Sequence, residues 1–166
     1  MIRDTTETAR EIGVADEVWV AACLLHREHP ERKDFTIREI VDRAAREGLH
    51  VRRRPGVYVH VVQHCVANRP ANPGRYRMLS ETRRGYRKVF LPGEGWHPDR
   101  NEGRTRPVAE ALPERYRDLV EWYEGLSNEV QAAAVDPILA LRGLGRDLWQ
   151  DQDADKYVAG LRQGWD

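Results

Sequence analysis

The sequence predicts a mainly α-helical fold with one small β-hairpin, an α+β arrangement in which further helices and an extended tail follow the hairpin. Two patterns support this prediction. Apolar residues recur at helical spacing in three successive segments between residues 15 and 67, and they alternate with polar residues between residues 76 and 90. Positive charge gathers in the second half of this region, in a chain whose formal net charge is zero.

The composition is that of one domain with appendages. The chain has 166 residues, of which 40% are apolar and 33% are charged, enough for one modest core. Its apolar runs are shorter than the ~20 residues that span a bilayer, and residues 1–10 lack the apolar core of a signal peptide. Cys23 and Cys65 stand in apolar contexts, which favours buried thiols over a disulfide framework. We therefore expect a cytoplasmic protein.

One window of the chain is strongly cationic. Between His50 and Phe90 there is a single acid, Glu81, so the window has a net charge of +9 and the rest of the chain sums to −9. Charge segregated in this way is typical of nucleic-acid-binding proteins. The ten basic residues of the window are Arg52, Arg53, Arg54, Arg69, Arg75, Arg77, Arg83, Arg84, Arg87 and Lys88.

The first helix is expected from Ala15, after a flexible arm formed by residues 1–14. Asp16 and Glu17 suit the positive end of the helix dipole, and Pro30 ends the pattern. The helix is expected to be amphipathic, with an apolar stripe made of Val18, Ala21, Ala22 and Leu25.

The second helix has both of its ends marked in the sequence. Thr36 and Glu39 form the S/T-x-x-E capping box, in which each side chain satisfies a backbone donor of the first turn. Gly48 stands at the position that follows a helix end, with Leu49 as its apolar contact. The apolar face between these ends consists of Ile37, Ile40, Val41, Ala44 and Ala45.

The segment 55–67 has two interpretations. Its valines favour a β-strand, whereas Val57, Val61 and Cys65 repeat at helical spacing and Pro55 suits the first turn of a helix. We prefer a helix preceded by three arginines and keep a buried strand as the alternative.

A basic hairpin is expected after the turn-rich loop NRPANPG of residues 68–74. Arg84 and Gly85 lie near its turn. The alternating positions are Tyr76, Met78, Tyr86, Lys88 and Phe90. Three helices followed by a basic hairpin make a winged helix-turn-helix, so residues 15–92 are predicted to form such a domain.

Residues 35–92 resemble the winged-helix domains of bacterial and archaeal proteins of unassigned function. The resemblance rests on F-T-I-R-E-I-V near the start, V-x-x-H-V-V-x-x-C-V-A-N in the third helix and R-R-G-Y-R-K-V-F in the hairpin. In such folds the third helix enters the major groove and the hairpin lies along the backbone or minor groove. Double-stranded operator DNA is therefore the expected partner. The expected contact residues are Arg52, Arg53, Arg54, Tyr58, His60, Arg83, Arg84, Arg87 and Lys88.

The chain after the hairpin is divided by glycine and proline. Residues 93–106 are polar and rich in glycine, which is typical of a linker. Residues 107–135 are predicted to be a helical connector that packs on the winged-helix domain or pairs with its copy in a homodimer. Its first helix has Pro113 near its start and Gly125 at its end, and a second short helical pattern begins at Ser127. The apolar face of the first helix consists of Tyr116, Leu119, Val120 and Tyr123.

The tail, residues 136–166, has the composition of a partner-binding segment. Two stretches rich in apolar residues and arginine, Ile138 to Trp149 and Tyr157 to Trp165, flank an acidic joint. Short helices of this kind are marginal alone, and tryptophan, tyrosine and arginine are enriched in binding hot spots. The tail is therefore expected to fold on binding to a partner's groove.

The tail also resembles the toxin-binding tail of VapB-type antitoxins, through A-L-R-G-L-G-R-D-L-W and D-A-D-K-Y-V-A-G-L-R-Q-G-W-D. In that family the tail wraps a PIN-domain ribonuclease, and an arginine commonly reaches toward its acidic, Mg²⁺-binding active site. The resemblance implies a PIN-domain ribonuclease toxin as partner and gives that role to Arg146, since a guanidinium pairs with carboxylates as a bidentate fork. The implied toxin-binding residues are Leu141, Arg142, Leu144, Arg146, Leu148, Trp149, Tyr157, Val158, Leu161, Arg162 and Trp165.

Metal-binding and catalytic patterns are weak in this sequence. His60 and His64 lie four residues apart beside Cys65, but further ligands at metal spacing are missing from the sequence, whereas structural zinc usually takes four. Ser80 and Ser127 lack the context of a nucleophile elbow. We expect no metal, no cofactor and no enzymatic activity.

Two functions fit these patterns. The first is a type II antitoxin that binds operator DNA through a winged helix and neutralises a PIN-domain ribonuclease through its tail, with repression strengthened when the toxin bridges antitoxin dimers. The second is a winged-helix transcriptional regulator or accessory module whose tail mediates self-association only.

Overall fold

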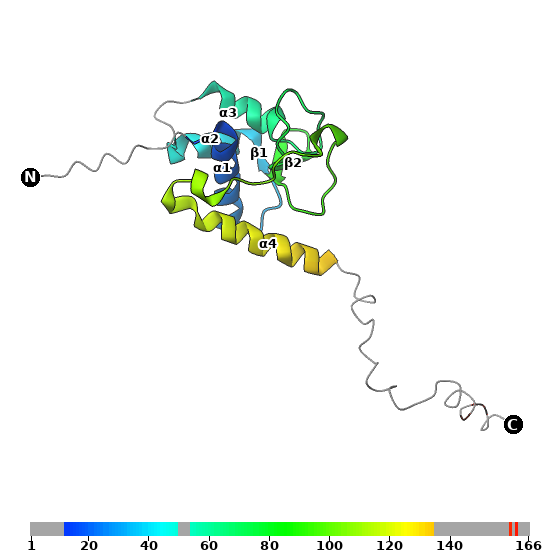
Figure 1. Ribbon diagram of the computed structural model, residues 1–166. Coiled ribbons are helices and arrows are strands. Elements are labelled where there is room, and N and C mark those ends of the chain that lie inside the picture. The colour runs from blue at the N-terminus through cyan, green and yellow to red at the C-terminus, as the bar shows by residue number, and fades with distance from the viewer. Residues whose placement is uncertain (1–11, 50–53, 135–159, 161, 163–166) are drawn as a thin grey trace, which may run out of the picture. The chain divides into compact units, whose positions relative to one another are not determined.

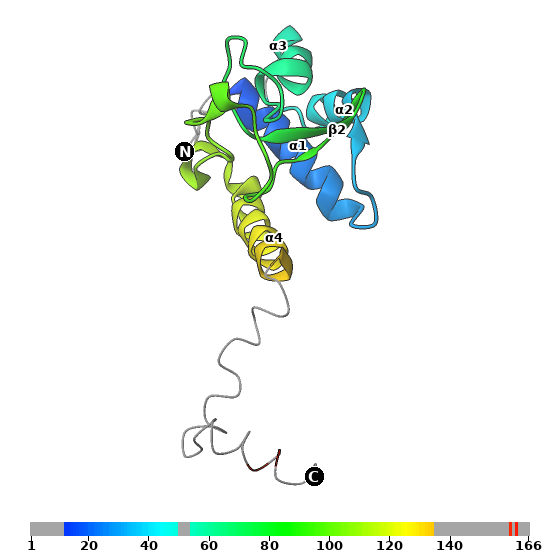
Figure 2. The same cartoon turned by 90° about the vertical axis from the view of Figure 1, so that its right-hand side faces the viewer.

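The computed structural model describes residues 12–49, 54–134, 160 and 162. The chain divides into two units, residues 1–130 and 131–166. The described residues have an α+β fold with four α-helices and one three-stranded antiparallel sheet (Figures 1 and 2). The main elements are α1 (Val14–Glu28), β1 (Phe35–Thr36), α2 (Ile37–Glu47), α3 (Pro55–Val59), the π-helix η1 (His60–His64), β2 (Leu79–Arg83), β3 (Tyr86–Val89) and α4 (Asp118–Ala134). Three short 3₁₀-helices, η2 (Pro98–Arg100), η3 (Ala109–Ala111) and η4 (Glu114–Tyr116), lie between β3 and α4.

Helix α1 is the centre of the core (Figure 1). Every residue from Ala15 to Leu25 is buried, including the charged Asp16 and Glu17. The predicted apolar stripe is therefore buried, but the opposite face of the helix is buried as well, so the expectation that only one face of this helix is buried is wrong. Neighbouring elements cover α1 all round, and the ring of Trp19 packs edge-on against Tyr123 with 5.6 Å between centroids.

Helix α2 begins and ends where the sequence predicts. The Thr36 hydroxyl accepts from the Glu39 backbone N–H at 3.2 Å, and the Glu39 carboxylate accepts from the Thr36 N–H at 2.8 Å. Gly48 follows the helix with φ of 58°, a left-handed conformation that favours glycine. Arg32 also donates to the Glu39 carboxylate at 2.7 Å, and this bond is the main reason that the pKa of Glu39 falls to about 2.

The segment after Arg54 is helical, which confirms the preferred prediction and rules out the buried strand. Helix α3 begins with Pro55 in its first turn, where the missing N–H of proline costs no helical hydrogen bond. The chain then widens into the π-helix η1, which ends at His64. Val57, Val61 and Cys65 face the core, as their helical spacing predicts.

The sheet has the strand order β1-β3-β2. The predicted hairpin is confirmed: Leu79 pairs with Val89, and the chain reverses at Gly85, whose φ is 82°. Strand β1 was not predicted. Its two residues pair with β3, Phe35 opposite Arg87, so the sheet joins the entrance of α2 to the hairpin.

Residues 93–106 do not form the free linker that their composition suggested. The Glu94 carboxylate accepts from the Ser80 hydroxyl at 2.8 Å, and the Arg77 N–H donates to the Arg104 carbonyl at 2.9 Å. At Gly103 an added Cβ would come within 1.8 Å of the Arg75 carbonyl oxygen, so this loop approaches the neighbouring backbone more closely than any side chain allows. Glycine here serves close packing.

The first part of the connector packs on its own domain. The apolar face predicted for it, which includes Leu119 and Tyr123, is buried, and the Tyr123 hydroxyl donates to the Phe90 carbonyl at 2.7 Å. The predicted end at Gly125 is wrong, because α4 continues through it to Ala134. A glycine inside a helix costs only about 1 kcal/mol, which the buried face of α4 offsets.

We predict that His26 makes the domain less stable in mild acid. Its Nε2 accepts from the Val89 backbone N–H at 3.3 Å, and burial lowers its pKa from 6.5 to about 4, assisted by the charge of Lys88. The unfolded chain binds a proton near pH 6.5 and the folded protein does not, so stability present above that pH is lost as pH falls toward 4. The loss reaches up to about 3 kcal/mol.

Urea unfolding at pH 7 and pH 5 measures this effect. The His26→Gln variant should lose less free energy of unfolding between the two values than the native chain, with a residual slope from His60, whose pKa burial also lowers. Glu39 contributes to the pH dependence of the free energy of unfolding only below about pH 4.5, because its pKa is lowered from 4.5 to about 2. An identical pH dependence in the variant would rule out His26 as the cause.

Candidate nucleic-acid interface

The turn of the hairpin holds two exposed arginines. The side chain of Arg83 is 63% exposed and its guanidinium lies over the ring of Tyr86, 3.7 Å from the centroid. Its Nη2 is also 3.7 Å from a carboxylate oxygen of Asp34. This long ion pair partly offsets the positive charge of Arg83 but leaves its guanidinium accessible to solvent. Arg84 is exposed at the turn itself. Both are accessible to an anionic ligand, as a contact with DNA phosphates requires.

The next two basic residues of the hairpin are engaged within the protein. Arg87 is 1% exposed, and it donates to the carbonyls of Val61 and Val62 and to the carboxylate of Glu81. The prediction that Arg87 contacts DNA is wrong, because strand alternation turns it to the buried face of the sheet. Lys88 is ion-paired with Glu94 and only a third of its side chain is exposed, so it is not a free cation either.

The arginine run before α3 is described only at its last member. Arg54 is half-buried and donates to the Ile12 carbonyl at 3.0 Å, and its Nε lies 4.0 Å from the carboxylate of Glu17. It therefore ties α3 to the start of α1 rather than standing free for phosphate. Arg52 and Arg53 lie outside the described residues.

The two side chains proposed to read bases differ in accessibility. Tyr58 is 57% exposed on α3, as that role requires, and Val59 beside it is 44% exposed. His60 is half-buried, its Nδ1 lies 2.8 Å from the Gly56 carbonyl, and its ring packs edge-on against His64 with 4.8 Å between centroids. Burial lowers the pKa of His60, so at neutral pH it adds no positive charge to this surface.

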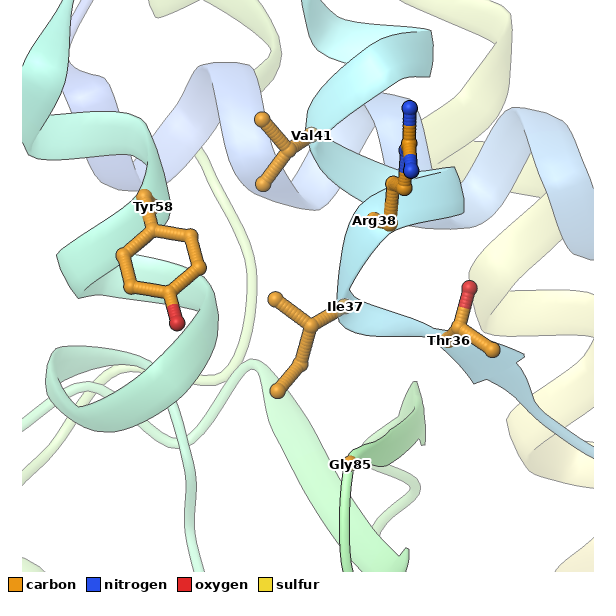
Figure 3. A pocket seen from close by; sticks show the side chains of 6 residues that line it. All are labelled: Thr36, Ile37, Arg38, Val41, Tyr58 and Gly85. Atoms are coloured by element: carbon orange, nitrogen blue, oxygen red, sulfur yellow. The ribbon is translucent and has the colours of Figure 1, made fainter.

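A shallow open groove lies between α2, α3 and the hairpin turn (Figure 3). Its volume is about 450 Å³. In Figure 3 the ring of Tyr58 and the side chain of Ile37 stand on either side of it, and Gly85 borders it at the hairpin turn. Arg38 stands at its edge with 91% of its side chain exposed. We call it the α2–α3 groove, and its lining residues are Thr36, Ile37, Arg38, Val41, Tyr58 and Gly85.

Two buried arginines bind the C-terminal end of the third helical segment. The last four carbonyls of a helix lack partners within it. Here Arg87 binds those of Val61 and Val62, at 3.0 and 3.2 Å. Arg100 binds those of Gln63 and His64, both at 2.8 Å. Two cations at the negative end of a helix also suit its dipole, so this pair fixes the orientation of α3 and its exposed tyrosine.

Arg100 is fully buried, and all five of its hydrogen bonds go to backbone carbonyls. Besides Gln63 and His64 it binds Tyr76, Arg69 and Pro70, the last two in the turn-rich loop. Sequence reasoning missed Arg100, since it stands in a glycine-rich polar stretch that has no local pattern. Arg87 had a signal, because alternation along the strand puts it on the same face as Val89.

The residues proposed to bind a toxin lie outside the described residues, with the exception of Arg162, which is helical and exposed. Where residues are described, no group of three or more histidine, cysteine, aspartate or glutamate side chains comes together in a way that could hold a metal ion. Nor does any helix in the described part of the chain have the length and apolar character to cross a membrane.

Comparison with known proteins gives no relative from which a function could be transferred. No family model matches the sequence, and neither the curated proteins nor the solved structures contain a match.

Proposed function

We propose that the first unit is a winged-helix domain that binds double-stranded DNA. The observation that carries this proposal is the order of its elements, helix, strand, helix, helix and hairpin, with β1 paired to β3. Tyr58 of α3 and Gly85 of the hairpin turn line the same groove, as expected if a helix that enters a major groove stands next to a loop that follows the DNA backbone. Duplex DNA is the proposed ligand because it offers a major groove for α3 and a phosphate backbone for the hairpin turn at the same time.

Accessible charge on this face supports the same ligand. Arg83 and Arg84 stand at the turn, and Arg38 stands at the edge of the α2–α3 groove beside them. Arg38 has a long contact of 3.6 Å to Asp42. Exposed ion pairs of this kind are weak, so Arg38 can exchange this contact for one with a phosphate. Phosphate contacts of this kind provide affinity and orient the protein, while sequence is read by what enters the groove of the DNA.

We predict that replacing Arg83 and Arg84 together with alanine weakens DNA binding at low salt and flattens its salt dependence. Each arginine that neutralises a phosphate releases counterions, which contributes about 0.9 to the slope of log K against log salt. The double variant should therefore lose nearly 2 from that slope. Fluorescence anisotropy of a mixed-sequence duplex, titrated with the full chain at several NaCl concentrations, measures it.

Two controls make the result specific to the turn. Replacing the same pair with lysine keeps both charges and should preserve the slope. Replacing the exposed Arg115 and Arg117 with alanine removes the same net charge next to α4 and should leave the slope nearly as it is. A salt slope that is unchanged in the Arg83 and Arg84 alanine variant would refute contact between the hairpin turn and the phosphates.

The wider proposal is that the whole chain is a type II antitoxin. Residues 131–166 form a unit of their own, which is compatible with a tail that binds a second protein while the first unit binds operator DNA as a homodimer. The resemblance of this tail to those of VapB-type antitoxins proposes a PIN-domain ribonuclease as that protein. The competing proposal, a DNA-binding regulator whose tail only self-associates, predicts no such partner. A PIN-domain gene adjacent to this one favours the antitoxin, and its absence next to every copy counts against it.

A further inference from the structure

The most exposed large side chains of the third helical segment are mainly apolar. Between Pro55 and His64, all of them described, the two most exposed large side chains are Tyr58 and Val59. Gln63 is the one amide in this stretch, and its side-chain nitrogen donates to the Pro70 carbonyl at 2.8 Å. No arginine, lysine or asparagine occurs there. The fork-shaped side chains that read guanine or adenine in the major groove are therefore missing from this helix or occupied.

The α2–α3 groove extends this apolar surface from α3 to α2. Tyr58 faces Ile37 and Val41 across it (Figure 3). The backbone of Gly85 forms one border, and this glycine adds no side chain to fill the space. The result is an apolar recess of about 450 Å³ that is open to solvent, which water fills at a free-energy cost until an apolar group replaces it.

The edges of the groove are cationic. Arg38 lines it, and Arg84 precedes the glycine that borders it. An apolar protein ligand would gain nothing from these charges, whereas a duplex presents phosphates on both sides of each groove. The occupant must therefore be anionic at its margins and apolar at its centre. In the major groove of DNA the apolar group is the C5-methyl of thymine.

We infer that the α2–α3 groove reads thymine methyl groups in the major groove of duplex DNA, with Tyr58 as the residue that determines this specificity. The inference rests on the proposed DNA-binding function and specifies the base that the protein recognises. Tyr58 covers the methyl group with its ring, Ile37 and Val41 remove it from water on the other side, and the arginines hold the flanking phosphates. Each methyl group buried in this way should strengthen binding about fourfold.

Removal of the methyl group without any other change to the base tests the inference. Two duplexes of equal length are compared, one of alternating dA and dT and one of alternating dA and dU, with the full chain in anisotropy titrations at several NaCl concentrations. We expect tighter binding to the thymine duplex by at least fourfold, with the same salt slope for both because their phosphates are alike. A second pair, alternating dG and dC with and without 5-methylation of cytosine, restores the methyl group at the same position and should show a preference for the methylated duplex.

Variants of the groove separate methyl recognition from differences in DNA shape. Tyr58→Ala should bring the ratio of the two affinities close to one, while Tyr58→Phe, which keeps the ring, should retain the ratio. Val108→Ala is the matched control: Val108 is also 57% exposed but does not line the groove, so the ratio should not change.

The outcomes distinguish this inference from the proposal on which it rests. Equal affinity for the thymine and uracil duplexes, with a normal salt slope, overturns methyl recognition and leaves DNA binding intact. A preference for thymine that survives in Tyr58→Ala overturns the role of the groove. Failure to bind any duplex overturns the DNA-binding proposal itself.

Discussion

Replacing Arg100 with methionine should lower the free energy of unfolding by about 3–5 kcal/mol. Methionine has no donors, so five backbone carbonyls would lose the hydrogen bond from Arg100. The carbonyls of Gln63 and Pro70 keep a second donor, the Val66 backbone N–H and the Gln63 side chain, whereas those of His64, Arg69 and Tyr76 would lose the donor that Arg100 now provides. An unsatisfied buried polar group costs about 1–3 kcal/mol. Water that enters the space left by the guanidinium would donate to some of these carbonyls and reduce the total loss. Since a small domain is stabilised by only about 5–15 kcal/mol, this loss is a large fraction of the total.

Urea unfolding followed by circular dichroism measures the loss, and two further variants interpret it. Arg100→Lys keeps the charge but has three donors instead of five, so it should be intermediate. Arg117→Met removes an exposed arginine whose one hydrogen bond, to the Leu112 carbonyl, is 3.3 Å long, and it should change stability by less than about 0.5 kcal/mol. If Arg100→Met costs as little as this control, the buried guanidinium does not hold the loop and helix together.

Truncation after Asp136 should abolish rescue from a co-expressed PIN-domain ribonuclease while DNA binding is retained. The truncated chain keeps all of α4, which ends at Ala134, and it removes every residue that the resemblance assigns to toxin contact. Tail residues of the hot-spot types contribute about 2 kcal/mol or more each, so their joint loss leaves no useful affinity. Growth of cells that express the toxin, together with anisotropy of the purified chain on duplex DNA, measures the two properties separately.

A finer variant keeps the tail and removes two of its anchors. Replacing Trp149 and Trp165 with alanine in the full chain should weaken toxin capture by at least about 30-fold for each tryptophan that acts as a hot spot. Thermal melting of the first unit should be unchanged in both variants. Full rescue by the truncated chain would contradict the assignment of the tail and favour a regulator that has no toxin partner.

The candidate interface was predictable in part. Tyr58, Arg83 and Arg84 are accessible, as their proposed roles require. Arg87 was assigned to the same surface because a count of charge in a window does not tell an exposed guanidinium from a buried one. Its position on the strand predicted its burial: side chains alternate between the two faces of a sheet, so Arg87 shares a face with Val89, two residues away, and not with its neighbour Lys88. The α2–α3 groove could not be foreseen, because its walls come from three elements whose packing no local pattern records.

The sequence by itself determined the features whose causes lie within a few residues. The start of α2 follows from two side chains that bond each other's backbone, and the turns at Gly48 and Gly85 follow from a residue without a Cβ. The helical spacing of Val57, Val61 and Cys65 likewise favoured a helix over a strand for the third element, because this spacing brings the three side chains to one face only in a helix. The strand alternative stayed open until the structure showed the helix.

Only the tertiary structure decided which charges face water. Arg100 meets carbonyls 24 to 37 residues away in the chain, and α1 is enclosed because other elements close around it, whatever its own pattern suggests. A guanidinium is stable in the interior when distant backbone satisfies all of its donors, and at the surface when it does not. That balance depends on where the rest of the chain lies, so the same residue type forms the scaffold at positions 87 and 100 and the accessible charge at positions 83 and 84.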